Sequence, residues 1–457
     1  MATVNQVTLV RGGHVLTMGP AGDLADGAVA FADGAILAVG PHHELAARFP
    51  GAETVGDRSG IVLPGLVNCH THLSEALIPG MGEELTLFEW GSRIVTPAGR
   101  HLTREMGRVG AMLKGAELLL SGATTVSDMF CHTNMGSLAS LGAVDGMEAM
   151  GLRGVASFGA EDSFDPHPVA AFMEEHQALA ERCAKTGLVS FRLGVGTLLG
   201  QSDELLEASA RAAGERGWAV HTHLAEVREE VVHARLRWGH SSVEHARAVG
   251  LLEAPLLAAH CVWVDQAEVG LLAAAGVAAV HNPVANMILA SGVCPLPALR
   301  AAGVPVGLGT DGAASNDSQD MLEVPKAAAL LQKVARLDPR ALLAGDALAM
   351  ATIEGARCLG LDALVGSLEP GKRADLVRLH GGGPGLAVVH DPHQQVVYCA
   401  SAADVADVWV DGRRLVAGGR LLDHDLAELV GASRPLAAEL VTRAGLRAWS
   451  RLARDDP

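Results

Sequence analysis

Short apolar runs alternate with amphipathic, alanine- and leucine-rich stretches through the middle of the chain. Stretches such as ELLEASARAAGERG and DQAEVGLLAAAG have apolar residues at helical spacing and predict helices between the runs. Strands that alternate with helices predict a parallel sheet, and eight runs favour a closed (β/α)8 barrel of the TIM type over a doubly wound open sheet. The runs are 60–67, 123–128, 153–158, 189–196, 218–224, 256–264, 277–283 and 304–312.

Both ends of the chain carry β-like runs joined by glycine-containing turns. QVTLVRGGHVLTM and GAVAFADGAILAVG each predict a hairpin, with Gly12-Gly13 and Asp33-Gly34 at the turns. A further hairpin is predicted around Asp411-Gly412. We expect the two ends to form one small β-sandwich domain. The predicted organisation is 1–60 and 366–420 for that domain, 61–365 for the barrel, and 421–457 for a helical tail.

Metal-binding residue types follow the apolar runs. His70 and His72 come after the first run and share a strand face, because side chains at i and i+2 point the same way. In a barrel, the carboxyl ends of all strands meet on one face. The later runs end in His221, His223, Glu226, His260, His281 and Asp311. Three imidazoles and a carboxylate suit Zn²⁺, or Fe²⁺ by ligand type.

A metal of this kind lowers the pKa of a bound water and supplies hydroxide at neutral pH. Glu226 lies three residues after His223 and is the carboxylate expected to move protons. The H-x-E and P-C-x-x-C signature of the zinc deaminases that act on nucleic acid bases is absent from the sequence. We therefore expect a hydrolytic site on a barrel rather than that other fold.

Composition narrows the class of protein. The net charge of −17, the single Tyr and the 3% aromatic content argue against a nucleic acid partner. The seven cysteines form no C-x-x-C pair and are expected to be reduced. No signal peptide and no apolar run long enough for a membrane span can be recognised. A cytoplasmic enzyme without a membrane partner is the prediction.

Six motifs together are similar to those of one known family. They read PGLVNCHTHL, HTHLAE, AAHCVW, HNPVANMILASG, GLGTDGAASND and GSLEPGKRADLV, in the family order, over residues 60–380. The chain resembles the amidohydrolase superfamily, in its cytosine deaminase-like and chlorohydrolase-like branch. The resemblance implies a barrel with a small β domain built from both termini, and a homo-oligomer.

The resemblance also implies roles for individual residues. Glu226 corresponds to the proton shuttle, and His260 to the histidine that hydrogen-bonds the attacking hydroxide and the developing oxyanion. His221 is expected to be structural or to support the ligands. The implied metal ligands are His70, His72, His223 and Asp311. Binuclear members carry a lysine at the end of strand four; VSFRLGVGTLLG has none, so one Zn²⁺ per chain is predicted.

The implied reaction is hydrolytic deamination of an amino-substituted N-heterocycle, with Asp311 passing a proton to the leaving amine. In relatives that deaminate adenosine-type nucleosides, a segment similar to GMGEELTLFEW contacts ribose, which points to Glu89 and Trp90 as substrate contacts; the alternative is a helix cap over a packed Trp. His281 is a further candidate near the pocket. Those relatives carry a histidine where this chain has Gly196, which weakens the adenosine assignment and leaves guanine-type, 8-oxoguanine, pterin and triazine substrates open.

Two other functions compete with deamination. The same site could hydrolyse a cyclic amide or a triazine chloride, and ammonia release separates these reactions. A barrel that serves only binding or assembly is disfavoured, because the complete ligand set and Glu226 are present.

Overall fold

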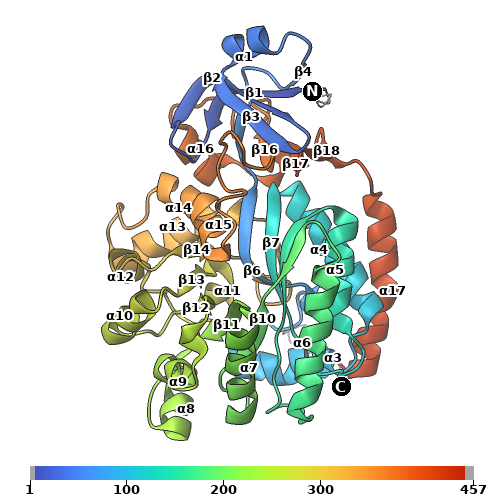
Figure 1. Cartoon of the computed structure of the whole chain (residues 1–457), viewed down its shortest axis with the longest axis vertical. Helices are drawn as coiled ribbons and strands as arrows, with labels where there is room; N and C mark the ends of the chain where they lie inside the picture. Colours follow the sequence, from blue (N-terminus) through green and yellow to red (C-terminus); the bar gives the residue numbers. More distant parts are fainter. Residues whose placement is uncertain (1–5, 448–457) are drawn as a thin grey trace. The chain divides into compact units, whose positions relative to one another are not determined.

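The computed structural model describes residues 6–447. Their contacts divide the chain into two compact units, each built from segments far apart in the sequence (Figure 1). The first unit contains the chain up to Asn68, together with Ala116–Thr125 and Asp320–Asp425. The second contains Cys69–Gly115, Val126–Gln319 and the chain from Leu426 onward.

A nine-stranded sheet in the first unit joins strands from both ends of the chain, in the order β19-β18-β17-β16-β5-β1-β2-β3, with β4 paired to β1. Its strands are β1 (Thr8–Leu16), β2 (Asp23–Ala32), β3 (Ala35–Pro41), β4 (Glu53–Val55), β5 (Ile61–Pro64), β16 (Leu376–Leu379), β17 (Val405–Val410), β18 (Arg413–Ala417) and β19 (Arg420–Leu421). Apolar side chains from both ends pack together, including Phe31 against Trp409 with ring centroids 6.2 Å apart. That this sheet folds into a sandwich remains a prediction.

Two of the three predicted hairpins are present. Asp33-Gly34 and Asp411-Gly412 join antiparallel strands and have positive φ at all four residues, as tight two-residue turns require. The predicted hairpin at Gly12-Gly13 is wrong, because both glycines lie inside β1. A Cβ on Gly13 would lie 2.0 Å from the Arg58 carbonyl oxygen, so glycine here permits close approach of another segment and makes no turn.

Two five-stranded sheets carry the other strands, in the orders β15-β6-β7-β8-β9 and β10-β11-β12-β13-β14. The ladders from β10 to β14 are parallel, as are those of β15 with β6 and of β8 with β9. A parallel bridge between Ala160 and Val195 links the two sheets. The strands are β6 (Leu66–His72), β7 (Ala123–Phe130), β8 (Arg153–Phe158), β9 (Val189–Phe191), β10 (Leu193–Thr197), β11 (Val220–Leu224), β12 (Leu256–His260), β13 (Ala278–His281), β14 (Val306–Leu308) and β15 (Asp311–Gly312).

Three of the eight predicted runs contain two strands each. The first run divides at Gly65 into β5, which belongs to the nine-stranded sheet, and β6. A Cβ on Gly65 would lie 2.1 Å from Thr124 Oγ1, so this point of the chain accepts only glycine. The fourth run divides into β9 and β10, and the eighth into β14 and β15.

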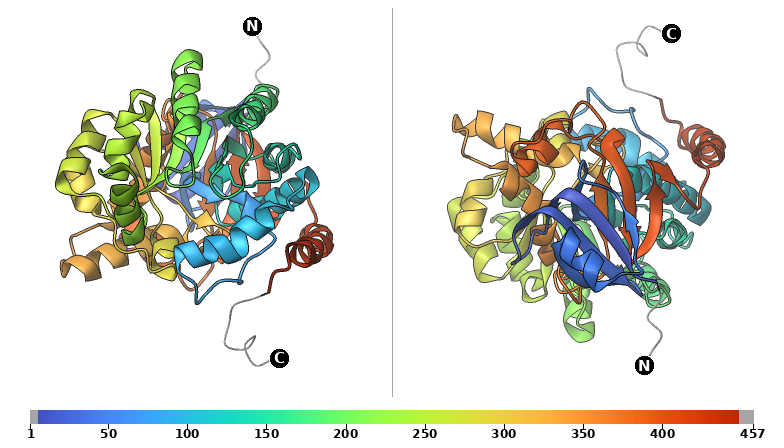
Figure 2. Two further views of the ribbon diagram at one scale, coloured as in Figure 1. Left: turned by 90° about the horizontal axis from the view of Figure 1, so that it is seen from below. Right: turned by 90° about the horizontal axis from the view of Figure 1, so that it is seen from above.

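Helices follow most of the parallel strands, and in the left view of Figure 2 they lie around them. The predicted helix α7 is capped by Ser202, whose Oγ accepts from Leu205 N, and ends at Gly217 with φ 66°. The helices are α1 (His42–Arg48), α2 (Leu87–Trp90), α3 (Thr96–Gly99), α4 (Arg104–Leu120), α5 (Ala139–Met150), α6 (Val169–Cys183), α7 (Asp203–Arg216), α8 (Arg228–Trp238), α9 (Ser242–Ala248), α10 (Gln266–Ala274), α11 (Pro283–Ile288), α12 (Leu296–Ala301), α13 (Glu323–Arg336), α14 (Ala344–Met350), α15 (Ile353–Leu359), α16 (Pro392–Cys399) and α17 (Leu426–Ala444).

The helical tail predicted for 421–457 contains α17, and its last ten residues, 448–457, lie outside the described residues. Within residues 6–447, no helix is both long enough and apolar enough to cross a membrane. The cytoplasmic location remains a prediction.

Candidate active site

Side chains from four strands of the second unit converge on one point. His70 comes from β6, His223 from β11, His260 from β12 and Asp311 from β15. One ligand atom from each lies within 4.8 Å of the ligand atoms of the other three. None of the four residues is more than 9% exposed. Such a buried group of imidazoles and a carboxylate is a candidate metal site.

His72 reaches the same point. Its Nε2 lies 3.0 Å from His223 Nε2 and 3.3 Å from Asp311 Oδ1. His70 Nε2 is 3.2 Å from the same Asp311 oxygen. The structure therefore brings together all four predicted ligands, with their donor atoms facing a shared centre.

Backbone carbonyls hold two of these rings in one tautomer. His72 Nδ1 is 2.7 Å from the Met129 carbonyl oxygen, and His223 Nδ1 is 2.6 Å from that of Gly196. A carbonyl only accepts hydrogen bonds, so each Nδ1 carries the proton and donates. Each Nε2 then presents its lone pair to the centre, as a metal ligand must.

A chain of polar groups orients His70 in the same way. Ser157 Oγ donates to the Asp128 carbonyl oxygen at 2.8 Å, so it can accept from His221 Nδ1 at 3.2 Å. His221 Nε2 is then free to accept from His70 Nδ1 at 2.9 Å. The lone pair of His70 consequently lies on Nε2. His221 thus supports a predicted ligand, as expected for that residue.

Burial and charge match the ionic states that a metal requires. Burial lowers the pKa of His70 to about 4 and that of His223 well below its ordinary value. Burial alone would raise the pKa of Asp311, but hydrogen bonds with His70 and His72 hold it well below its ordinary value. His70 and His223 are therefore neutral and Asp311 is an anion, which fits a divalent metal. Burial lowers the pKa of His72, but Cys131 and Asp311 raise it overall to well above its ordinary value, so His72 must lose a proton to bind the metal.

The backbone at the strand ends adopts unusual conformations. Ala225, His260 and Asp311 have φ of 51°, 73° and 67°, in the left-handed region that residues with a Cβ rarely enter. The Asp311 carbonyl oxygen accepts from Thr71 Oγ1 and Gln319 Nε2, both at 2.9 Å. These contacts fix the position of Asp311, and strain of this kind is typical of functional sites.

Glu226 lies beside the centre rather than in it. Its Oε2 is 3.4 Å from His260 Nε2, and its Oε1 accepts from Ser291 Oγ at 3.2 Å. Its backbone N–H donates to Glu230 Oε2 at 2.8 Å, which fixes the turn after β11. Burial raises the pKa of Glu226 to about 7. A carboxyl group with such a pKa exchanges protons readily near neutral pH.

His260 connects Glu226 with the centre. Its Nδ1 donates to Asn286 Oδ1 at 2.9 Å, which leaves Nε2 directed toward Glu226 and Asp311. The distance from His260 Nε2 to Asp311 Oδ2 is 3.9 Å, longer than the corresponding distances from His70 and His72.

The three residues predicted to contact the substrate differ in their exposure and hydrogen bonds. Glu89 Oε2 accepts from the Thr86 backbone N–H at 3.2 Å and caps α2, with its side chain 45% exposed. Trp90 is buried, and its Nε1 donates to the Ala314 carbonyl oxygen at 3.1 Å. His281 is buried at the end of β13, and neither ring nitrogen has a hydrogen bond partner among the described residues. Contact of these residues with substrate stays a prediction.

Glu75 is a carboxylate of the second unit that was not predicted as a site residue. It is buried, its Oε2 accepts from Ala314 N at 3.1 Å, and burial raises its pKa to about 8. The sequence held a signal for it, because HTHLSE at 70–75 matches HTHLAE at 221–226. The matching histidines meet in the structure, His70 with His221 and His72 with His223.

Glu161, in the loop after β8, is a second carboxylate that was not predicted as a site residue. Its Oε1 accepts from the backbone N–H and from Oγ1 of Thr197, both at 2.8 Å. Burial raises its pKa to about 7, although the residue keeps some solvent exposure. A Cβ on Gly196 would lie 2.5 Å from Glu161 Cγ. Glycine at position 196 therefore makes room for this carboxylate.

We expect Gly196→Ala to lower the free energy of unfolding by about 1–3 kcal/mol, because the new methyl group overlaps Glu161, which two hydrogen bonds hold in place. Urea unfolding monitored by circular dichroism measures the change. Gly214→Ala is the matched control, because no atom lies within 4 Å of a Cβ there and α7 gains helix propensity. Equal stability of both variants would show that Glu161 moves away without cost.

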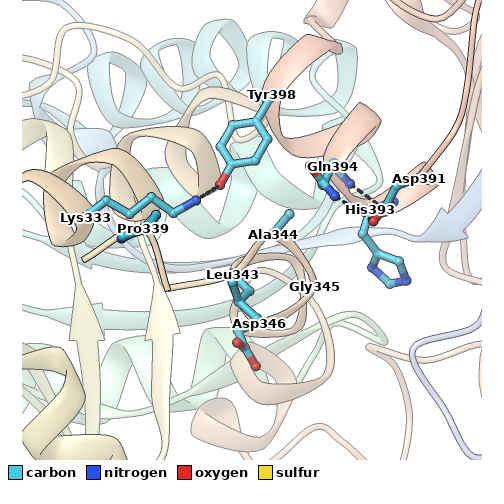
Figure 3. Close-up of a pocket in the computed structure, with 10 residues that line it drawn as sticks. All are labelled: Lys333, Pro339, Leu343, Ala344, Gly345, Asp346, Asp391, His393, Gln394 and Tyr398. Atoms are coloured by element: carbon cyan, nitrogen blue, oxygen red, sulfur yellow. Dashed lines mark hydrogen bonds between the residues drawn. The ribbon is translucent and has the colours of Figure 1, made fainter. Parts of the chain in front are cut away.

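A cavity of about 530 Å³ lies within the first unit (Figure 3). On one side, Lys333 Nζ donates to the hydroxyl of Tyr398 at 2.6 Å. The cavity contains none of the predicted site residues, so its size does not make it the active site.

Comparisons with known proteins agree with this geometry. The chain is 37% identical over 441 residues to a 5-methylthioadenosine/S-adenosylhomocysteine deaminase of Desulforudis audaxviator, covering 95% of this chain and 99% of the relative. It is 38% identical over 440 residues to a 5'-deoxyadenosine deaminase of Methanothermobacter thermautotrophicus, covering 95% and 99%. The crystal structure of an adenosine deaminase from Xanthomonas campestris with bound zinc matches with a TM-score of 0.89 and 31% identity, over 95% of this chain and 98% of that one.

The model of the amidohydrolase family matches residues 61–415. This range contains every strand that contributes to the candidate site. The chain therefore belongs to the amidohydrolase family.

Proposed function

We propose that this protein deaminates an adenosine-type nucleoside by hydrolysis, with one Zn²⁺ held by His70, His72, His223 and Asp311. Family membership and the names of its relatives identify a hydrolase that acts on carbon–nitrogen bonds other than peptide bonds. The observation that carries the proposal is the set of Nε2 atoms facing Asp311, with Nδ1 donating outward to fixed acceptors in three rings.

A divalent metal held by these residues would supply a hydroxide nucleophile at neutral pH and polarise the substrate. The zinc in the Xanthomonas campestris structure supports Zn²⁺ as the metal. We assign His72 to the ligand set and His260 outside it, because His260 lies farther from Asp311 and close to Glu226.

Glu226 moves protons in the proposed reaction. Its carboxylate accepts a proton from the attacking water and delivers it to the ring nitrogen next to the reacting carbon. The pKa of about 7 allows both transfers near neutral pH. Ser291 holds the second carboxylate oxygen, which keeps the first directed toward His260 and the centre.

His260 and Asp311 complete the reaction. In its doubly protonated form, His260 donates from Nδ1 to Asn286 and from Nε2 to the oxyanion that forms when the carbon becomes tetrahedral. Asp311 carries a proton from the nucleophile to the leaving amine, and ammonia departs.

The relatives' names support an adenosine-type substrate that differs from adenosine at the 5' position. Trp90 joins α2 to the loop after Asp311, which is consistent with a substrate contact in this segment. Glu161, at the position that Gly196 opens, adds a carboxylate that can accept from a hydroxyl or amino group of the substrate.

Three further features belong to the same proposal. The bridge between Ala160 and Val195, and the pairing of β15 with β6, support closure of the two parallel sheets into an eight-membered barrel. The sheet shared by both termini supports a small domain built from 1–60 and 366–420, with 61–365 forming the barrel. A homo-oligomer in the cytoplasm is proposed from the family alone.

Ammonia release from a panel of amino-heterocycles tests the function. Zinc-loaded protein would be given 5'-methylthioadenosine, adenosine, guanine, 8-oxoguanine, cytosine, a pterin and melamine. We expect release from the adenosine-type nucleosides and little from the free bases. Release from a free base alone would contradict the substrate class. Hydrolysis of a cyclic amide or a triazine chloride, without ammonia release from the panel, would contradict deamination.

A further inference from the structure

A second cavity, of about 460 Å³, lies within the second unit and is mainly apolar. We call it the apolar cavity; it is lined by Phe88, Phe164, Leu199, His233, Leu236 and Arg237. These residues come from α2, from the loops after β8 and β10, and from α8, which follows β11. All four segments follow the carboxyl ends of strands in the two sheets that carry the candidate site.

Two residues that line the apolar cavity lie close in sequence to residues of the candidate site. Leu199 lies three residues after Gly196, whose carbonyl oxygen accepts from His223. Phe88 lies two residues before Trp90, which binds the Ala314 carbonyl oxygen in the loop after β15. The cavity therefore lies on the side of the strands where the substrate must enter.

The walls of the apolar cavity are held by hydrogen bonds. Arg237 Nη1 donates to the Leu199 carbonyl oxygen at 3.1 Å, and its Nη2 to that of Gln201 at 2.7 Å. Ser163 N donates to the Gly200 carbonyl oxygen at 3.0 Å, next to Phe164. The guanidinium of Arg237 also pairs with the Asp203 carboxylate, with Nη2 3.4 Å from Oδ1, so its charge is already matched within the protein.

Large apolar side chains around this cavity are exposed. Phe88, Phe164 and Leu236 are 41%, 46% and 78% exposed, and the Phe88 ring meets His233 edge-on at 5.7 Å. Single exposed apolar residues are common, but several from separate segments around one cavity mark a site for an apolar ligand group.

We propose that the apolar cavity receives an uncharged, apolar substituent of the substrate at the end remote from the reacting amino group. This inference rests on the proposed function. On an adenosine-type nucleoside, the substituent is a small alkyl or thioether group at the 5' carbon. A zwitterionic amino acid at that position would meet apolar walls and lose its hydration without a counter-charge.

Substrates that differ only at the 5' carbon test the proposal. We expect kcat/KM for 5'-methylthioadenosine to exceed that for adenosine by about 10- to 200-fold, the range for small apolar groups in an apolar pocket. S-Adenosylhomocysteine should be the poorer substrate of the two thioethers. Equal kcat/KM for all three nucleosides, or a preference for S-adenosylhomocysteine, would overturn the proposal while deamination itself stands.

Two variants test whether the preference for 5'-methylthioadenosine over adenosine arises at the apolar cavity. Phe88→Ala and Leu236→Glu should each raise KM for 5'-methylthioadenosine about tenfold or more, with kcat and the values for adenosine changed little. Val334→Glu, at a 67% exposed position of α13, is the matched surface control. A similar loss for both substrates would overturn the proposal, and absence of deamination in the wild type would overturn it together with the proposed function.

Discussion

We expect Glu226→Gln to lower kcat for deamination by about 10²–10⁴-fold, the usual contribution of a general acid–base residue. Glutamine has the shape of glutamate and can still accept from Ser291, but it cannot take a proton from water. Zinc content should remain at the wild-type level, because Glu226 lies outside the group of ligands. Ammonia release per bound zinc is the measurement.

Glu229→Gln is the matched control for this substitution, because Glu229 is an exposed carboxylate in the first turn of α8. It should keep wild-type activity. If Glu226→Gln kept more than about a tenth of wild-type kcat with its zinc in place, Glu226 would not be the proton carrier.

The pH dependence of kcat/KM also tests whether Glu226 is the proton carrier. The active form of Glu226 is the carboxylate, so kcat/KM should fall about tenfold per unit as pH drops below its pKa. Burial raises that pKa to about 7, and a bound cation lowers it again, so the acidic limb should lie at or below pH 7. The residual activity of Glu226→Gln should lack this limb.

The second large effect distinguishes the role of His72 as a metal ligand from the role of His260 in the reaction. We expect His72→Ala to lower zinc affinity by more than about 100-fold. Even the loss of a residue that only supports a metal ligand lowers metal affinity by about 10–100-fold. His260→Ala should keep the zinc and lose activity by about 10²–10³-fold, as for a lost oxyanion donor. The reason is geometric, because His72 Nε2 faces both His223 and Asp311, whereas His260 Nε2 lies nearest Glu226.

Metal analysis of the purified variants measures this difference, with His43→Ala as control because the His43 side chain is 83% exposed. If His72→Ala kept its zinc and His260→Ala lost it, His260 would be the metal ligand and His72 would not. The exchanged ligand set would then be His70, His223, His260 and Asp311, whose ligand atoms also lie within 4.8 Å of one another.

Strand periodicity accounts for most of what the sequence could predict about the site. A period of two places His70 and His72 on one face of their strand, and His221 and His223 on one face of theirs. The parallel arrangement then brings these ends together, which the contacts between matching histidines confirm. Which of His72 and His260 binds the metal depends on distances that spacing cannot supply.

Burial of single carboxylates could not be predicted in the same way. Glu161 is held by Thr197 on another strand, and the space it occupies depends on the absence of a side chain at Gly196. The sequence shows each residue but not their contact. The prediction for the glycines of β1 failed for a similar reason, because Gly13 is required by the approach of Arg58 rather than by a turn.

Ammonia release from 5'-methylthioadenosine, measured against bound zinc, shows whether a single zinc ion per chain supports deamination. The metal-free protein would be titrated with zinc while initial rates and zinc content are followed together. We expect no release without metal and a linear rise that ends at one zinc per chain, with rates about 10²–10⁴-fold lower in Glu226→Gln. Release without metal, or a rise that continues to two zinc ions per chain, would contradict it.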